Sequence, residues 1–428
     1  MKRPLALAVA AVLVLCAGVT IAAEPDSLRR TPVVKAIERA GPAVVNISTT
    51  KLLGSAFYQD WFGRWRARRP VKSVGSGVIV HPDGYVVTNS HVVKQATEIL
   101  VGLGGNGQEQ SYRAVLVAHN EANDIAVLKI AREKPFPAVH LGRSDDLMIG
   151  EPTIAVGNPF GVGKTVTTGI LSAVGRKVDV SSEVSFVDFL QTDAAINPGN
   201  SGGALLNIHG DMIGLNTAII RGGDGIGFAI PVDRVKAIVA MLIDEALAIR
   251  DLGLTGEAGT EGIRVETVEK GRVADGAGIE PGDRIVAVDG RVAKSIFDLA
   301  SPILTAAPGS KVTLTVSRDG GKETLALTTA EEPYLAYVQR RLGLTGKDLP
   351  EDTTKRGGYG VVVVSVTPKS PSERIQMKGG DLVISFAGEP VKNIAALASL
   401  VYRAEAGKAV SLEVVRERRR MGGDIIPR

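Results

Sequence analysis

The sequence predicts a mainly β protein whose strand-rich first part is followed by two copies of a smaller α+β module. From Ser76 to Ile230, short apolar runs alternate with glycine, asparagine and proline turns, a pattern typical of antiparallel barrels or sandwiches. Beyond Ile249, short runs of sequence recur, and such self-similarity indicates duplicated modules. The 50 glycines among 428 residues also favour a turn-rich β structure over a helical bundle.

Predicted helices border the strand-rich part on both sides. Residues 31–40 carry apolar side chains at helical spacing, and Val44–Ile47 then predicts a strand. The segment from Phe57 to Trp65 contains both tryptophans among arginines and turn residues, so we expect an aromatic loop there. Such a loop either packs into the core or meets a partner subunit. Val232–Ile249 predicts one amphipathic helix that closes the first domain.

Two pairs of related runs carry the repeat. Leu252–Gly256 recurs as Leu342–Gly346, and Gly282–Val286 recurs in related form as Gly380–Ile384. Each copy continues with a helix-like stretch and a strand, at 296–304 and 312–316 in the first copy and at 394–402 and 410–415 in the second. The predicted organisation is a leader at 1–23, a strand-rich domain at 24–249, and modules at 250–333 and 334–428.

The first residues have the features of a secretory signal peptide. Lys2 and Arg3 precede an apolar run from Leu5 to Ala23, which ends in small residues. The run is nearly long enough to span a membrane, so an uncleaved anchor is the alternative. Cleavage would remove Cys16, the only cysteine. The exported protein would then have no disulfide, no thiol nucleophile and no cysteine metal site.

Charge and motifs give no support to nucleic acids, cofactors or metals as partners. The formal net charge is only +4, and we expect the basic clusters at 64–69 and 416–420 to be a solvated loop and tail. The run Gly161–Thr165 looks like a phosphate loop, but Asn158 stands where that motif needs its first glycine. There is no H-E-x-x-H run or other carboxylate–histidine cluster. We therefore predict that no cofactor and no metal is needed.

Three residues have the surroundings that nucleophilic catalysis requires. Ser201 lies in the run Gly199–Gly203, whose glycines allow a tight turn that can aim backbone N–H groups at one point. A serine needs a base, and His91 directly follows a predicted strand. Asp124 stands at the head of the apolar strand Ile125–Leu128, where it could orient an imidazole. The order His, Asp, Ser is the chymotrypsin-like order.

Several longer runs make the resemblance specific: 75–79 (GSGVI), 88–93 (TNSHVV), 124–128 (DIAVL), 157–161 (GNPFG), 191–203 (QTDAAINPGNSGG) and 225–231 (GIGFAIP). With these runs the chain resembles the HtrA/DegP family of trypsin-fold serine proteases with PDZ domains. The resemblance implies a chymotrypsin-like double β-barrel of two six-stranded barrels, with the triad between them, followed by two α+β PDZ domains. It also implies that Ser201 attacks the peptide carbonyl and that His91, held by Asp124, transfers the proton.

The same resemblance implies further site residues. The N–H groups of Gly199 and Ser201 would form the oxyanion hole. Substrate contacts would come from Ile196, Asn200, Asn216, Thr217, Ala218, Ile219, Ile220 and Arg221. Because three of these residues are isoleucines, we expect a preference for small or medium aliphatic side chains.

The modules would bind C-terminal peptides at Leu252, Gly253 and Leu254 and at Leu342, Gly343 and Leu344. A spacer domain with a vestigial groove is the alternative for either module. The second module lacks the usual proline before its Gly-Asp pair.

The predicted function is that of an exported, periplasmic quality-control endopeptidase that degrades unfolded or damaged proteins. The family assembles as homotrimers or multiples of them, and the aromatic segment from Phe57 to Trp65 is our candidate for the trimer contact. Ala204 replaces a frequent proline, and residues 51–72 form a shorter loop than in some relatives. Two alternatives are a PDZ-based chaperone or scaffold with a resting protease site, and a regulated site protease anchored in the inner membrane.

Overall fold

The computed structural model describes residues 29–51, 57–59, 65–67, 71–94, 96–105, 108–132, 134–158, 163–179, 185–197, 199–217, 225–350, 358–417 and 419–428. The predicted signal peptide at 1–23 and the basic residues Arg64, Arg68 and Arg69 lie outside these ranges. In the described part, no helix is both long enough and apolar enough to cross a membrane.

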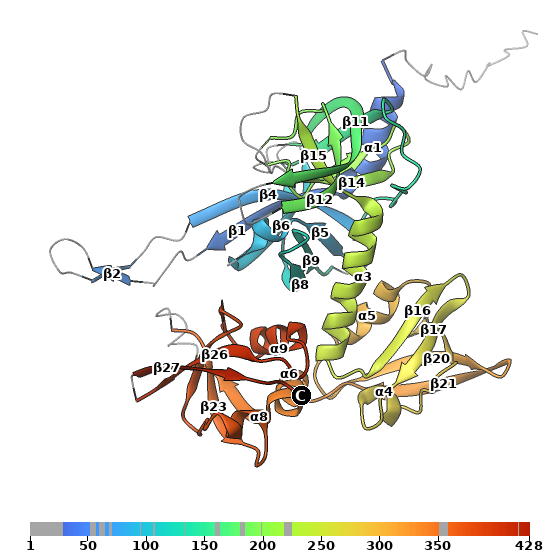
Figure 1. The fold of residues 1–428 in the computed structure, drawn as a ribbon. Coiled ribbons are helices and arrows are strands. Elements are labelled where there is room, and N and C mark those ends of the chain that lie inside the picture. Colours follow the sequence, from blue (N-terminus) through green and yellow to red (C-terminus); the bar gives the residue numbers. More distant parts are fainter. Residues whose placement is uncertain are drawn as a thin grey trace, which may run out of the picture.

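The first half of the protease-like part is one antiparallel sheet in the order β7-β6-β1-β4-β5-β9-β8. Its edge strands β7 and β8 are separated in the chain only by Ala114, whose N–H donates to the Ile99 carbonyl at 2.9 Å. One bent segment therefore forms both edges, and the sheet curls on itself (Figure 1). The strands are Val44–Lys51 (β1), Val71–His81 (β4), Tyr85–Thr88 (β5), Ala96–Gly105 (β6), Gln108–Arg113 (β7), Val115–Asn120 (β8) and Ile125–Lys129 (β9).

The second half is a closed six-stranded barrel in the order β10-β11-β12-β15-β14-β13. Its interior is filled by fully buried aliphatic side chains such as Ala155, Leu171 and Leu205. If β7 and β8 are taken as one bent strand, both halves have the six-strand plan that the resemblance implied. The strands are Pro152–Gly157 (β10), Thr165–Asp179 (β11), Ser185–Thr192 (β12), Ala204–Leu206 (β13), Met212–Thr217 (β14) and Gly227–Pro231 (β15).

The entry into the first sheet follows the predicted helix and strand. Helix α1 (Pro32–Ala40) begins after Thr31, whose Oγ1 accepts from the Val34 N–H at 3.4 Å, and a short 3-10 turn (η1, Gly41–Ala43) leads into β1. The expectation of an aromatic loop is wrong in part, because β2 (Phe57–Gln59) and β3 (Trp65–Ala67) pair antiparallel. Aromatic residues favour extended backbone, which accounts for the short strands. Trp61 and Phe62 lie outside the described residues.

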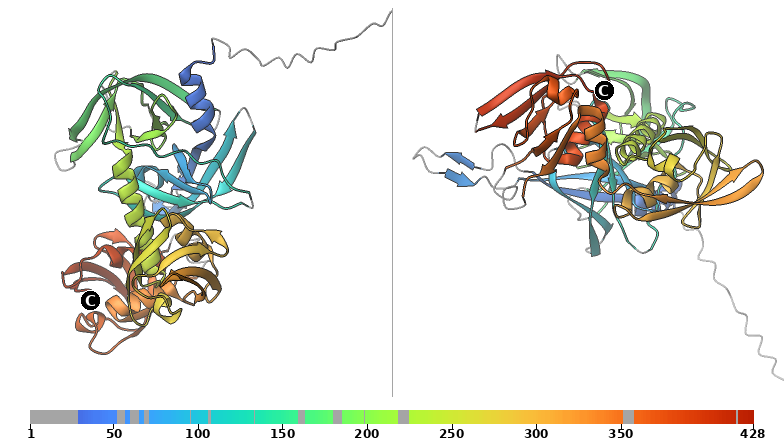
Figure 2. Two further views of the ribbon diagram at one scale, coloured as in Figure 1. Left: turned by 90° about the vertical axis from the view of Figure 1, so that its right-hand side faces the viewer. Right: turned by 90° about the horizontal axis from the view of Figure 1, so that it is seen from below.

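Helix α3 (Val232–Ile249) is the predicted closing helix, with the same bounds, and it joins all three parts of the molecule. Its sides contact β8, β9 and β14 of the barrels. They also contact α5 (Ile296–Thr305) of the first module, and α6 (Pro333–Leu342) and α9 (Ile394–Arg403) of the second. Figure 2 shows the helix passing from the barrels to the modules. On α3, Glu245 is 3 % exposed and accepts from Ser399 Oγ at 2.7 Å and from Arg403 Nε at 3.3 Å. The second module is therefore attached to this helix by a buried polar contact.

The two modules have the same topology, with sheets ordered β16-β17-β18-β20-β21 and β22-β23-β24-β26-β27. The edge strands β21 and β27 and the connecting helix α6 were not predicted. The first module comprises Leu254–Gly259 (β16), Gly262–Val268 (β17), Val273–Gly276 (α4), Arg284–Val288 (β18), Arg291–Val292 (β19), Ile296–Thr305 (α5), Lys311–Arg318 (β20) and Gly321–Thr328 (β21). Pro333–Leu342 (α6) leads to Leu344–Asp348 (β22), Val361–Val366 (β23), Pro371–Arg374 (α8), Leu382–Phe386 (β24), Glu389–Pro390 (β25), Ile394–Arg403 (α9), Val410–Arg416 (β26) and Arg419–Ile425 (β27).

The aspartate of the repeated Gly-Asp pair makes the same buried ion pair in both modules. Asp283 and Asp381 are 2 % and 1 % exposed, and each binds an arginine of the following long strand through Nε and Nη2 at 2.6–2.7 Å, Arg318 and Arg416 respectively. The arginine lowers the pKa of Asp283. Burial raises the pKa of Asp381, but Arg416 and Lys378 together lower it below its ordinary value. The expectation of a solvated basic tail at 416–420 is therefore wrong for Arg416, because this arginine binds the buried Asp381. The local sequence did not reveal this contact, since the two residues are 35 positions apart.

Candidate active site

The turn between β8 and β9 presents a carboxylate to a histidine. Asp124 ends this turn with φ +52 and is 7 % exposed. Its Oδ2 lies 2.8 Å from Nδ1 of His91, and its Oδ1 accepts from the His91 N–H at 3.0 Å. Asn89 Nδ2 donates to the Asp124 carbonyl oxygen at 3.0 Å. Side chain and backbone of the aspartate are thus both fixed against the segment that carries the histidine.

His91 lies on the one-turn helix α2 (Ser90–Val93), which directly follows β5 and Asn89. Its side chain is 50 % exposed, whereas that of Asp124 is 10 % exposed. A carboxylate beside Nδ1 favours the tautomer that carries a proton on this nitrogen. Nε2 is then the ring nitrogen that can exchange a proton with a nucleophile. The pair has the exposure expected of a base that faces a substrate and an orienting acid that faces the protein.

The loop of Ser201 and the helix of His91 both contact strand β4 at Gly75. This glycine is so close to both that an added Cβ atom would lie 2.8 Å from Val92 Cγ1 on helix α2 and 3.5 Å from the carbonyl oxygen of Ser201. The next residue of β4, Ser76, donates its N–H to that same oxygen at 2.9 Å. The helix of His91 and the loop of Ser201 therefore meet over residues 75–76. The structure thus brings the three predicted triad residues to one region from three separate parts of the chain.

The glycine after Ser201 is required by its surroundings. Gly202 has φ +82, and a Cβ atom there would lie 2.2 Å from the Ser76 carbonyl oxygen and 2.3 Å from Thr88 Oγ1. Its N–H donates to the Asn216 carbonyl at 2.8 Å. No other residue could take this conformation and leave the neighbouring strands where they are. The glycines of the 199–203 run are thus explained by close backbone packing beneath the serine.

Ser76 is a supporting residue to which the sequence analysis assigned no task. Its hydroxyl donates to the Gly199 carbonyl oxygen at 2.5 Å and accepts from the Asn158 N–H at 2.8 Å. Its own carbonyl accepts from Thr88 Oγ1 at 2.7 Å. The side chain of Ser76 therefore fixes the peptide group between Gly199 and Asn200, which adjoins the N–H of Gly199, one of the two predicted oxyanion donors. Its place in the Gly75–Gly77 run was the only available signal.

The side chains of two residues predicted to contact substrate bind other groups of the protein instead. Asn216 is fully buried, and its Nδ2 donates to the Ala204 carbonyl at 2.9 Å. Thr217 is 1 % exposed, and its Oγ1 donates to Asp124 Oδ2 at 3.3 Å. The side chain of Thr217 therefore supports the aspartate of the pair. A contact of either residue with substrate stays a prediction.

Two further residues predicted to contact substrate, Asn200 and Ile196, pack against glycines of neighbouring segments. Asn200 is 3 % exposed and packs against Gly157, whose Cβ, if present, would be 2.5 Å from Asn200 Oδ1. Ile196 is half-buried and packs on Gly227. Strand β13 and the loop before it cover β14 only as far as Asn216. The remaining predicted contacts, Ala218, Ile219, Ile220 and Arg221, lie outside the described residues.

The predicted peptide loops of the modules have matching geometry. Gly253 and Gly343 have φ +71 and +74, and their carbonyls accept from Glu269 N–H at 2.8 Å and Thr367 N–H at 2.7 Å. The leucines Leu252, Leu342 and Leu344 are at most 1 % exposed, so they belong to the module cores. Each loop leads into an edge strand, β16 or β22, with one side unpaired in the sheet order. An edge of this kind can accept an added peptide strand.

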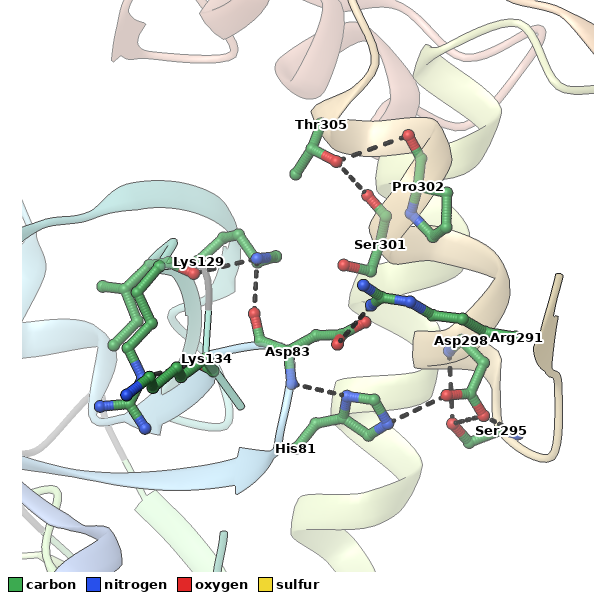
Figure 3. Close-up of polar contacts among 12 residues, drawn as sticks. His81, Asp83, Lys129, Lys134, Arg291, Ser295, Asp298, Ser301, Pro302 and Thr305 are labelled. Atoms are coloured by element: carbon green, nitrogen blue, oxygen red, sulfur yellow. Dashed lines mark hydrogen bonds and ion pairs between the residues drawn. The ribbon is translucent and has the colours of Figure 1, made fainter. Parts of the chain in front are cut away.

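The first module packs against the hairpin that leads to His91 (Figure 3). Phe297 of α5 stacks on the ring of His81, with centroids 5.2 Å apart, and lies 4.7 Å from the ring of Tyr85. Nε2 of His81 is 3.3 Å from Asp298 Oδ1, while its Nδ1 accepts from the Asp83 N–H. Burial raises the pKa of Asp298, but bonds from His81, Lys294 and Ser295 hold it well below its ordinary value. Because Nδ1 accepts a hydrogen bond, the one proton of a neutral His81 ring lies on Nε2, which can donate it to Asp298. The contact between His81 and Asp298 therefore does not require a second proton on the ring.

Comparison with known proteins agrees with this arrangement. A trypsin-like peptidase domain matches residues 75–215, and a PDZ domain matches residues 250–329 and again 341–424. The periplasmic serine endoprotease DegP of Salmonella typhimurium is 39% identical over 347 residues, which cover 77% of this chain and 72% of that protein. The chain belongs to the DegP family of serine endoproteases.

Two further relatives fit the same family. The periplasmic pH-dependent serine endoprotease DegQ of Escherichia coli is 34% identical over 409 residues, covering 89% of this chain and 88% of that one. The solved HtrA-type protease AlgW with a decapeptide is 37% identical and covers 70% of this chain and 98% of that one, with a TM-score of 0.42. The prediction of a mainly β, trypsin-like peptidase domain followed by two PDZ domains is confirmed. Among the described residues, no cluster of three or more histidine, cysteine, aspartate or glutamate side chains could hold a metal ion.

Proposed function

We propose that this DegP-family serine endopeptidase acts with His91, Asp124 and Ser201 as its catalytic triad. The observation that carries the proposal is the twofold bond between His91 and Asp124, placed across β4 from the Ser201 loop. His91 takes the proton of the Ser201 hydroxyl as it attacks the peptide carbonyl, and returns it to the leaving amine. Asp124 stabilises the imidazolium that forms between these two steps.

The N–H groups of Gly199 and Ser201 stabilise the oxyanion in this scheme. Ser76 supports the role of Gly199, because its hydroxyl fixes the peptide group on the other side of that residue. Removing one oxyanion donor typically costs about 10²–10³ in turnover. Residues 218–221 would bind the substrate backbone, and Ile196, Ile219 and Ile220 would select small or medium aliphatic side chains. A survey of cleavage sites in a denatured protein tests this preference, and a majority of sites after Lys or Arg would contradict it.

The experiment that tests the triad is degradation of β-casein by the mature protein beside its Ser201→Ala variant. Cleavage by the wild type and none by the variant supports the serine mechanism. Reaction of a fluorophosphonate probe at Ser201, lost in the variant, would support it independently. An unreactive wild-type protein, even with an apolar C-terminal peptide added, would favour the alternative of a PDZ-based chaperone or scaffold with a resting protease site.

The setting we propose is the periplasm, with unfolded or damaged proteins as substrates and C-terminal peptides as ligands of the PDZ domains. Support comes from the signal-like residues 1–23 and from relatives that are named periplasmic endoproteases. The proposed division of the chain is 24–249, 250–333 and 334–428. N-terminal sequencing of the exported protein distinguishes a cleaved leader from an inner-membrane anchor, and with it a soluble protease from an anchored site protease.

We further propose a homotrimer, or a multiple of one, with the aromatic segment from Phe57 to Trp65 as the contact. The pairing of β2 with β3 is the part of this segment that the structure describes. Replacing Trp61 and Phe62 by alanine should produce monomers in sedimentation velocity experiments. An unchanged trimer would assign the contact to another surface.

A further inference from the structure

The β8–β9 hairpin holds the helix of His91 at three successive points. Before the histidine, Ser90 Oγ lies 2.9 Å from Nδ1 of His119 on β8. At the histidine itself, Asp124 binds both the N–H and Nδ1. Beyond it, Lys94 Nζ donates to Glu121 Oε2 at 2.6 Å. One hairpin therefore contacts the start, the middle and the end of a helix that has only one turn.

These three contacts differ in how much they exclude water. Ser90 is 1 % exposed, so its hydroxyl depends on a protein partner. Lys94 and Glu121 have side chains that are 48% and 38% exposed, and such pairs contribute little. Among the two contacts that flank His91, the buried bond between Ser90 and His119 is therefore the one that can determine the orientation of the helix.

The surroundings of His119 keep its ring neutral. Burial, together with the nearby cation Arg403, lowers the pKa of His119 to about 4. The other charged groups that face it are Glu121, which acts in the opposite sense, and Lys94 and Lys392. Arg403 and Lys392 belong to the second PDZ domain, so β8 lies between that domain and the catalytic helix. A neutral imidazole can donate to or accept from Ser90, and it does not compete with His91 as a base.

We propose that His119 is a positioning residue for His91 and acts through the hydroxyl of Ser90. The inference rests on the proposed triad. Ser90 is the first residue of α2, and its side chain is bonded to a strand of the barrel, so this bond restrains rotation of the helix about its axis. A displacement of about 1 Å at a reacting group can cost about 10² in rate. Loss of the bond should therefore lower kcat and leave KM nearly unchanged, because the substrate strand is bound elsewhere.

The test compares His119→Ala, His119→Asn and Ser90→Ala with the wild-type protein on a chromogenic peptide. We expect kcat of His119→Ala to fall by about 10–100-fold. Asn places a polar atom near the position of Nδ1, so His119→Asn should recover most of the lost rate. In the double variant Ser90→Ala/His119→Ala, the second change should add no further loss. Glu121→Ala, on the same hairpin, is the matched control and should change kcat less than twofold.

Each other outcome contradicts a specific step. An unchanged kcat in His119→Ala, or two single losses that multiply in the double variant, overturns the inference while the wild type remains active. A His119→Asn variant that is as slow as His119→Ala, although both retain the wild-type melting temperature, also overturns it. A wild-type protein that neither cleaves peptide nor reacts with a fluorophosphonate at Ser201 refutes the proposed function itself, and the role of His119 with it.

Discussion

The carboxylate of Asp124 binds His91 twice, through the backbone N–H at 3.0 Å and through Nδ1 at 2.8 Å. One acid thus sets both the position of the histidine in the chain and the orientation of its ring. Thr217 Oγ1 donates a third bond to the same carboxylate at 3.3 Å. Because Asp124 is 7 % exposed, little water is present to replace any of these partners.

Replacing Asp124 by Asn should lower kcat by about 10⁴, because the amide favours the wrong imidazole tautomer and cannot stabilise the imidazolium. The fold should survive, since Asn keeps the size of the side chain. Peptide hydrolysis with melting temperature as a control measures this. Thr217→Val removes only the longest bond to the carboxylate, so we expect a loss of no more than about tenfold. Equal losses in the two variants would show that the charge of Asp124 is not the decisive property.

Ser76→Ala should reduce kcat by about 10–100-fold, because it frees the Gly199–Asn200 peptide group, which positions the neighbouring N–H of Gly199. It also leaves the Asn158 N–H without the hydroxyl that accepts from it. Each buried group without a partner costs about 1–3 kcal/mol of unfolding free energy. Steady-state kinetics and guanidinium unfolding measure the two effects. A stable variant with full kcat would argue against an oxyanion role for Gly199.

Gly202→Ala should destabilise the protein by about 2–5 kcal/mol and abolish activity, because the new methyl group meets two oxygen atoms of neighbouring strands. Gly225→Ala is a matched control. Gly225 also has a positive φ, +76, but a Cβ atom added there would have no neighbouring atom within 4 Å. This control should lose only about 1–2 kcal/mol from the strained backbone. Similar losses in both variants would assign the cost to φ alone.

Phe297→Ala should weaken the attachment of the first PDZ domain to the peptidase domain by about 1–2 kcal/mol, since two aromatic contacts are lost. Arg291→Ala is the control from the same interface. Arg291 is 80% exposed and 3.5 Å from Asp83, so its removal should cost less than about 0.5 kcal/mol. Small-angle X-ray scattering detects the expected increase in size for Phe297→Ala. An unchanged scattering curve would mean that α3 alone keeps the domains together.

The depressed pKa of His119 predicts a specific dependence of stability on pH. Its pKa is about 4 in the folded protein against an ordinary value of 6.5, so between these values the unfolded chain binds a proton that the folded protein does not. The free energy of unfolding should therefore fall as pH decreases from about 6.5 to about 4, by about 1–3 kcal/mol in total. Guanidinium unfolding at pH 7 and pH 5 measures this. The decrease should be smaller in His119→Asn, and an equal decrease in both proteins would contradict the assignment.

The predicted helices and the candidate triad could be identified from the sequence because apolar spacing and neighbouring residue types, over short runs, indicate them. Val232–Ile249 has apolar residues at helical spacing over its whole length, and the structure has the same bounds. Ser201 stands among glycines, and Asp124 stands at the head of an apolar strand. The strand β21 was missed because the run 321–328 begins with polar residues and alternates only at its end. The helix α6 was missed although its buried residues Pro333, Tyr337, Val338 and Leu342 recur at helical spacing. Their conformation is stabilised by packing against the modules.

The sequence by itself determined the order of the domains, the residues of the candidate catalytic triad and the duplication of the C-terminal module. Each of these properties depends on short runs of adjacent residues, so it can be recognised without knowing how distant parts of the chain pack together. Only the tertiary structure decided that Ser76 holds Gly199, that Thr217 faces Asp124 and that Arg416 pairs with Asp381. These partners are 35 to 123 positions apart. No local pattern encodes such contacts, because they arise only when separate strands are brought together by the burial of their apolar faces.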